Sequence, residues 1–126
     1  MKKRVSLLVA AAAMVCAPAA PAAGKADTRV TLDPHIEITP YGSIWTGKIF
    51  SSKKSCKNER RVIVYRVRDG QDDKLGSTLS HKGLASPGYF WGYDEAGIAR
   101  AGKYYAKVLP TNGCNGDRSA VYDFKP

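Results

Sequence analysis

After Asp27 the sequence lacks a second long apolar run, a heptad repeat and a low-complexity linker. A membrane-spanning helix needs about 20 apolar residues, so we expect no transmembrane segment in this region. A coiled coil needs a sustained heptad of apolar residues, so that class is excluded as well. The whole chain has 126 residues, and without a linker we expect a single domain with one modest core.

The sequence also lacks the motifs of common catalytic sites. It has no Gly-x-Ser-x-Gly nucleophile elbow and no glycine-rich phosphate loop that leads into a helix. Residues 51–54 spell the Ser-x-x-Lys of penicillin-interacting enzymes, but the Ser-Asp-Asn and Lys-Thr-Gly motifs of those enzymes are missing. Ser80 and His81 are neighbours, and neighbours on a strand point to opposite faces. We therefore expect no enzymatic activity and assign no catalytic residue.

Acidic residues and clustered metal ligands are sparse. The chain has 11 Asp and Glu against 20 Lys and Arg, for a formal net charge of +9. The acidic pairs at 72–73 and 94–95 lack the ligand series of a calcium loop, so we interpret them as solvated turns. Because there is no Cys-x-x-Cys or His-x-His cluster, we expect no metal and no cofactor. The alternative is a metal site built from dispersed residues: Cys56, Cys114, His35 and His81.

Residues 1–22 have the pattern of a cleavable signal peptide. A basic region at residues 2–4 precedes an apolar region at residues 5–15, and Ala-Pro-Ala at 17–19 or 20–22 offers a small-residue cleavage site. The apolar region is shorter than a bilayer span, which argues against a membrane anchor. We predict export to a secreted or periplasmic location, with a flexible mature N-terminus at residues 23–28.

Two of the three cysteines are expected to form a disulfide. Cys16 would be the modified residue of a lipoprotein, but Met14 and Val15 before it are larger than the residues such a site needs, so we expect Cys16 to leave with the signal peptide. In an oxidising compartment the remaining Cys56 and Cys114 should pair. The chain-entropy model assigns about 4 kcal/mol of stability to so long a closed loop.

The rest of the sequence has the pattern of short β-strands. Residues 60–68 predict a central strand, because β-branched and aromatic residues dominate and Asp-Gly ends the segment. Val62 and Val64 lie on one face of this strand, with Ile63 and Tyr65 on the other, so we expect both faces to be covered. Regular spacing between turn residues predicts a β-sandwich over residues 29–126. The other expected strands are residues 28–32, 35–39, 44–50, 75–80, 102–108 and 119–124.

Residues 84–100 form the least regular stretch. Glycine, Pro87 and a dense aromatic cluster predict a loop, and residues 94–100 predict one helical turn. The aromatic side chains would be a core plug or an exposed platform, and we expect at least two of them to fill the core of so small a domain. Residues 81–83 are predicted to be a turn, and the two Asn-Gly pairs around Cys114 predict a tight loop.

Residues 53–68 carry seven cations against Glu59 alone. Such a segment favours an anionic partner, although cations also protect exposed strands without any binding role. The partner would be an anionic envelope polymer or a protein; basic and aromatic interleaving also suits nucleic acid, but export argues against it. The candidate binding residues are Arg60, Arg61, Arg66, Arg68, Tyr89, Phe90, Trp91 and Tyr93.

The order of Cys56, residues 61–66, Gly70, residues 102–108 and Cys114 resembles small secreted bacterial immunoglobulin-like modules, in particular the prealbumin-like, Cna-B-type sandwiches. The resemblance implies an all-β, immunoglobulin-like antiparallel β-sandwich of about seven short strands with one disulfide. It also implies a structural or adhesive module without catalytic residues.

We therefore predict a non-enzymatic secreted module that binds a cell-envelope component or a protein partner through the basic strand and the aromatic-rich loop. One alternative is a small secreted inhibitor or effector that uses residues 84–100. The other is a purely structural domain.

Overall fold

The computed structural model describes residues 25–33, 36–97 and 99–126. The predicted signal peptide, Cys16 and His35 lie outside these residues. The described part contains ten β-strands and one turn of 3-10 helix, η3 (Lys54–Cys56). The strands are β1 (Thr28–Val30), β2 (Glu37–Thr39), β3 (Gly42–Ser51), β4 (Arg61–Arg66), β5 (Asp73–Leu79), β6 (His81–Lys82), β7 (Tyr89–Ala96), β8 (Gly102–Val108), β9 (Asp117–Arg118) and β10 (Tyr122–Phe124).

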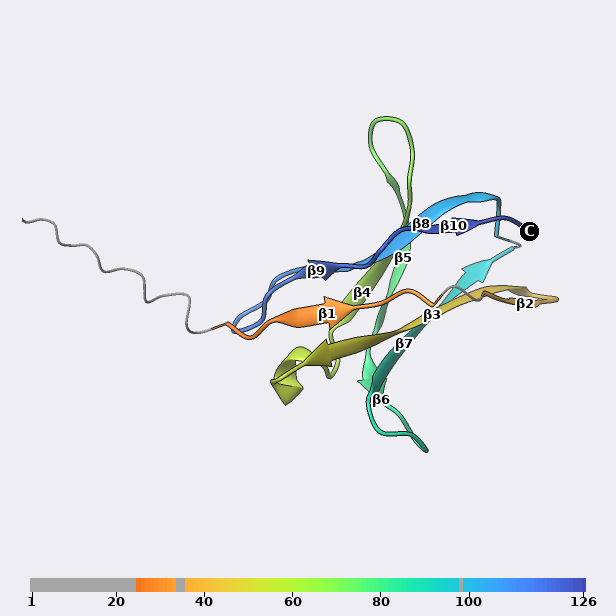
Figure 1. Ribbon diagram of the computed structural model, residues 1–126. Coiled ribbons are helices and arrows are strands. Elements are labelled where there is room, and N and C mark those ends of the chain that lie inside the picture. Colours follow the sequence, from red (N-terminus) through yellow and green to blue (C-terminus); the bar gives the residue numbers. More distant parts are fainter. Residues whose placement is uncertain (1–24, 34–35, 98) are drawn as a thin grey trace, which may run out of the picture.

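The strands form two antiparallel sheets (Figure 1). The first sheet has the order β1-β3-β7-β6, with β2 also paired to β3. The second has the order β10-β8-β4-β5, with β9 also paired to β8. The sandwich predicted from the regular spacing of short strands between turn residues is thus confirmed. The three strands beyond the predicted seven are β6, β7 and β9, which form where no strand was expected.

The core lies between the two sheets. Trp45 and Trp91 of the first sheet are almost fully buried, and they face the fully buried Val62 and Val64 of β4. β4 lies between β8 and β5, so the predicted central strand is confirmed. Ile63, on the opposite face of β4, is also buried, which confirms that both faces of this strand are covered. Large apolar side chains at alternate positions therefore hold the sheets together.

The prediction of a turn at residues 81–83 is wrong. Here the chain crosses from β5 in the second sheet to β6 in the first, where His81 and Lys82 pair with β7. Ser80 is buried at the corner, where its hydroxyl donates to the carbonyl of Lys57 and its N–H donates to the carbonyl of Arg60. A small polar residue can occupy this buried corner because its hydrogen bonds are satisfied there.

The prediction of a loop over residues 84–100 is wrong from Tyr89 onward. β7 lies in the middle of the first sheet, between β3 and β6, and residues 94–96 belong to this strand instead of a helical turn. The aromatic rings of β7 cover one glycine in the adjacent strand β3 and one in β5 of the opposite sheet: a Cβ added to Gly47 would lie 2.6 Å from the indole nitrogen of Trp91, and one added to Gly76 would overlap the ring of Tyr93. Glycine and aromatic residues thus combine in a regular sheet.

Candidate functional site

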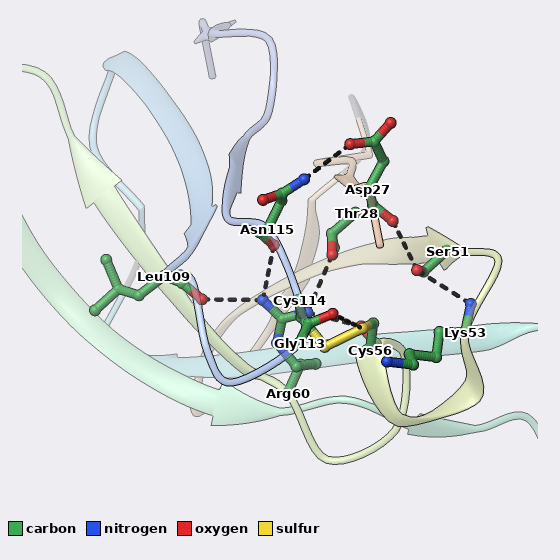
Figure 2. Close-up of a disulfide and its surroundings, with 10 residues drawn as sticks. All are labelled: Asp27, Thr28, Ser51, Lys53, Cys56, Arg60, Leu109, Gly113, Cys114 and Asn115. Atoms are coloured by element: carbon green, nitrogen blue, oxygen red, sulfur yellow. Dashed lines mark hydrogen bonds between the residues drawn. A yellow bond between two sulfur atoms is a disulfide. The ribbon is translucent and has the colours of Figure 1, made fainter. Parts of the chain in front are cut away.

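The predicted disulfide joins Cys56, the last residue of η3, to Cys114 in the loop between β8 and β9 (Figure 2). The two Cα atoms are 5.5 Å apart and both side chains are buried. The pairing predicted from the cysteine count is confirmed. Because both sulfur atoms are consumed in the disulfide, the alternative metal site loses its two thiolate ligands.

Arg60 is buried beside this disulfide, with only 4% of its surface exposed. Its guanidinium donates four hydrogen bonds of 2.9 to 3.2 Å (Figure 2). The acceptors, from three separate segments, are the Thr28 hydroxyl and the carbonyls of Cys56, Leu109 and Asn115. Burial lowers the pKa of Arg60. The side chain is enclosed and four of its five donors are occupied, so the predicted role of Arg60 in attracting a partner does not fit its position.

Two of the four aromatic candidates lie in the core. Tyr89 and Trp91 are buried, and the Trp91 indole N–H donates a 3.0 Å hydrogen bond to the Thr31 carbonyl. Tyr93 is half-buried and donates a 2.8 Å hydrogen bond to the Leu75 carbonyl in the other sheet. The expectation that at least two of these residues fill the core is confirmed. Phe90 points to the other face of β7, where it is half-buried and the ammonium of Lys48 lies 5.8 Å from its ring centroid, so the four rings do not form one platform.

The three other arginine candidates do not form one patch. Arg68 is exposed but makes a 2.6 Å salt bridge with Asp73. Arg66 is half-buried, and its side chain lies close to Gly102. Arg61 is exposed on the outer face of the second sheet, where its guanidinium donates a 2.9 Å hydrogen bond to the Ser77 hydroxyl. Arg61 is therefore the arginine of the candidate set that a partner can approach on this face.

Other cations surround Arg61 on the same outer face because of the strand register. Lys107 lies opposite Ile63 of β4 and opposite Arg118 of β9, and Lys74 lies opposite Tyr65. None of these cations forms a salt bridge within the part of the chain that the structure describes. We call this surface the basic face and define it by its four cations: Arg61, Lys74, Lys107 and Arg118.

Two tyrosines support the basic face. The rings of Tyr65 and Tyr105 are stacked with their centroids 5.2 Å apart, and the Arg118 guanidinium lies 3.8 Å from the centroid of Tyr105. The Tyr105 hydroxyl donates a 2.6 Å hydrogen bond to Asp72, which lowers the pKa of that carboxyl, as does the N–H of Arg68. Burial, followed by the hydrogen bond to Asp72, raises the pKa of Tyr105 to about 12. The ring is thus a fixed, neutral support for Arg118.

The sequence contained part of the signal for this face. The alternation of residues 102–108 predicted that Tyr105 and Lys107 point away from the core, which is the face they occupy, although Tyr105 is buried there by its neighbours. Their position next to Arg61 depends on the pairing of β4 with β8. Arg118 lies in a two-residue strand that only the pairing of β9 with β8 places on this face.

Within residues 25–33, 36–97 and 99–126, no group of three or more His, Cys, Asp or Glu side chains is placed to hold a metal ion. Over the same residues, no helix is long and apolar enough to span a membrane.

No protein-family model matches the chain, and comparison with curated proteins finds no match. The resemblance to Cna-B-type modules therefore stays a prediction.

Proposed function

We propose that this protein is a non-enzymatic, immunoglobulin-like binding module, exported to the periplasm or the medium, that recognises an anionic partner through its basic face. The observation that carries the proposal is the group of four cations around two stacked tyrosines, since none of these cations forms a salt bridge within the described residues. The Asp72 carboxylate, bonded to the Tyr105 hydroxyl, offsets part of the charge of Arg118. The group still carries an excess of positive charge in positions fixed by the sheet, and such a group attracts anions.

The strand order supports the immunoglobulin-like assignment. When β1, β3, β7 and β6 are matched to strands A, B, E and D, the second sheet has the order G-F-C-C′ of that architecture. The disulfide joins the loops at one end of the sandwich instead of strands B and F. Export is supported by the signal-peptide pattern of residues 1–22 together with this disulfide, since such bonds persist in oxidising compartments. An anionic envelope polymer is a partner available there.

The basic face can be tested with long-chain polyphosphate as a soluble anionic probe. The variant Lys74→Glu/Lys107→Glu should bind it about tenfold more weakly than the unchanged protein at low salt, and raised salt should weaken binding of the unchanged protein. The matched control is Arg29→Glu/Lys48→Glu, which makes the same change of net charge on the outer face of the first sheet.

The control decides between a specific surface and net charge alone. An equal loss of affinity in both variants would mean that polyphosphate senses only the total charge, and the basic face would lose its role. Absence of binding by the unchanged protein at low salt would contradict the proposal outright. In that case an inhibitory or purely structural role would be favoured, although an inhibitor would have to act without residues 89–96, which are part of the first sheet.

A further inference from the structure

Three leucines are exposed at the end of the sandwich where β4 begins. Leu79 lies opposite Arg61 in the pairing of β5 with β4 and is 44% exposed. Leu109 is 49% exposed and lines a small pocket of about 260 Å³ together with Arg61 and Ile63. Leu84 is fully exposed in the loop between β6 and β7. None of the three contributes to the core cluster between the sheets.

The same end carries lysines from the segment around η3 and from β6. Lys82 lies opposite Tyr89 in the pairing of β6 with β7, and the ammonium of Lys57 lies 5.1 Å from the ring centroid of Tyr89. η3 and the β6–β7 loop lie on the side of the molecule away from the projecting β4–β5 hairpin (Figure 1). We call this surface the leucine end and define it by its apolar and cationic members: Leu79, Leu84, Leu109, Lys53, Lys54, Lys57, Arg61 and Lys82.

Single exposed leucines are common on protein surfaces and need no explanation. Three of them among cations are different, because this combination matches the interface of an anionic bilayer, where apolar side chains enter the boundary of headgroups and acyl chains while lysines bind phosphates. A soluble polyanion would neutralise the lysines but leave Leu84 in water. The combination therefore favours a lipid surface over a free polymer as the occupant of this end.

We propose that the leucine end docks on an anionic lipid bilayer, with Leu84 and Leu109 inserted into the interface. This surface is distinct from the basic face and shares only Arg61 with it. The docking proposal rests on the proposed function in one respect, since both surfaces select an anionic partner. A domain docked by this end keeps the outer face of the second sheet free to bind a polymer.

Co-sedimentation with phosphatidylcholine vesicles, with and without phosphatidylglycerol, tests the docking. The protein is taken from a secreting host, and its mass must show that residues 1–22 have been removed, because that apolar segment would bind lipid by itself. We expect binding to the anionic vesicles only. Leu84→Ser/Leu109→Ser should weaken this binding about tenfold, because less apolar area enters the interface. Ile38→Ser/Tyr41→Ser, at exposed positions of the β2–β3 hairpin, should have little effect.

A Leu84→Trp variant gives an independent readout. Its fluorescence should shift to the blue and become protected from acrylamide with anionic vesicles, and should not change with polyphosphate. Equal vesicle binding by Leu84→Ser/Leu109→Ser and the unchanged protein, equal binding to neutral vesicles, or no vesicle binding would each overturn the docking proposal. The polyphosphate measurement is separate, so loss of vesicle binding with intact polyphosphate binding refutes only the leucine end.

Discussion

Replacing Arg60 with methionine removes the guanidinium but keeps an unbranched side chain of similar length. In the native protein two of its acceptors, the Thr28 hydroxyl and the Cys56 carbonyl, are bonded in buried surroundings, and the other two, the carbonyls of Leu109 and Asn115, are partly buried. A buried acceptor that loses its partner costs about 1 to 3 kcal/mol. The partly buried carbonyls can bond to water instead and contribute less.

The two buried acceptors set the expected size of the effect. Their combined loss is partly offset, because the variant no longer keeps a charge away from water. We therefore expect Arg60→Met to lower the free energy of unfolding by about 2 to 4 kcal/mol. The adjacent Arg61→Met is the matched control: its side chain is exposed, and such substitutions usually change stability by less than about 0.5 kcal/mol.

Urea unfolding at neutral pH, with the disulfide intact, measures this difference. The urea dependence of the unfolding free energy should be the same in both variants, since neither changes the surface exposed on unfolding. If Arg60→Met and Arg61→Met were equally stable, the four hydrogen bonds would not hold the loops together. The interpretation of Arg60 as a structural residue would then be wrong.

The remaining predictions concern Gly47 and Tyr105. Gly47→Ala should lower the unfolding free energy by about 1 to 3 kcal/mol by overpacking, because the added methyl group meets the backbone carbonyl oxygen of Thr31 and the indole of Trp91; Gly92→Ala, with no atom closer than 3.9 Å, is the control in the same urea assay. Since the pKa of Tyr105 is raised to about 12 in the folded state, the unfolded chain loses this proton first, near pH 10. The free energy of unfolding should therefore fall as the pH rises from about 10 toward 12, and it should fall less steeply in the Tyr105→Phe variant. Parallel profiles of urea midpoint against pH for the variant and the unchanged protein would contradict this.

The local sequence pattern was sufficient to predict those strands whose own residues determine which faces are buried. β8 alternates clearly and β4 is apolar on both faces, so the apolar faces of β8 and the central place of β4 followed from residues 102–108 and 60–68 alone. The disulfide also followed from local facts, because the signal peptide predicted for residues 1–22 accounts for the third cysteine. These features need no knowledge of which strand lies beside which.

β7 was mispredicted because its regularity depends on distant partners. Viewed alone, glycines between aromatic residues indicate an irregular segment. The ring of Trp91 needs open space above the adjacent strand and that of Tyr93 needs space against the opposite sheet, and Gly47 and Gly76 supply this space from other parts of the sequence. The complementary positions become visible only when the register of β3 with β7 and the approach of β5 are known.

The basic segment, residues 53–68, was also misjudged because its geometry depends on the fold and not on the local sequence. Residues 53–68 suggested one charged surface, but the strand geometry divides the cations: Arg60 points inward to carbonyl groups, Arg68 is paired, and the lysines around η3 lie at the leucine end. Arg61 alone belongs both to that end and to the basic face. For this reason neither the polyphosphate experiment nor the vesicle experiment uses an Arg61 variant. The charge of Arg61 contributes to both surfaces, whereas Lys107 and Leu84 each report on one surface.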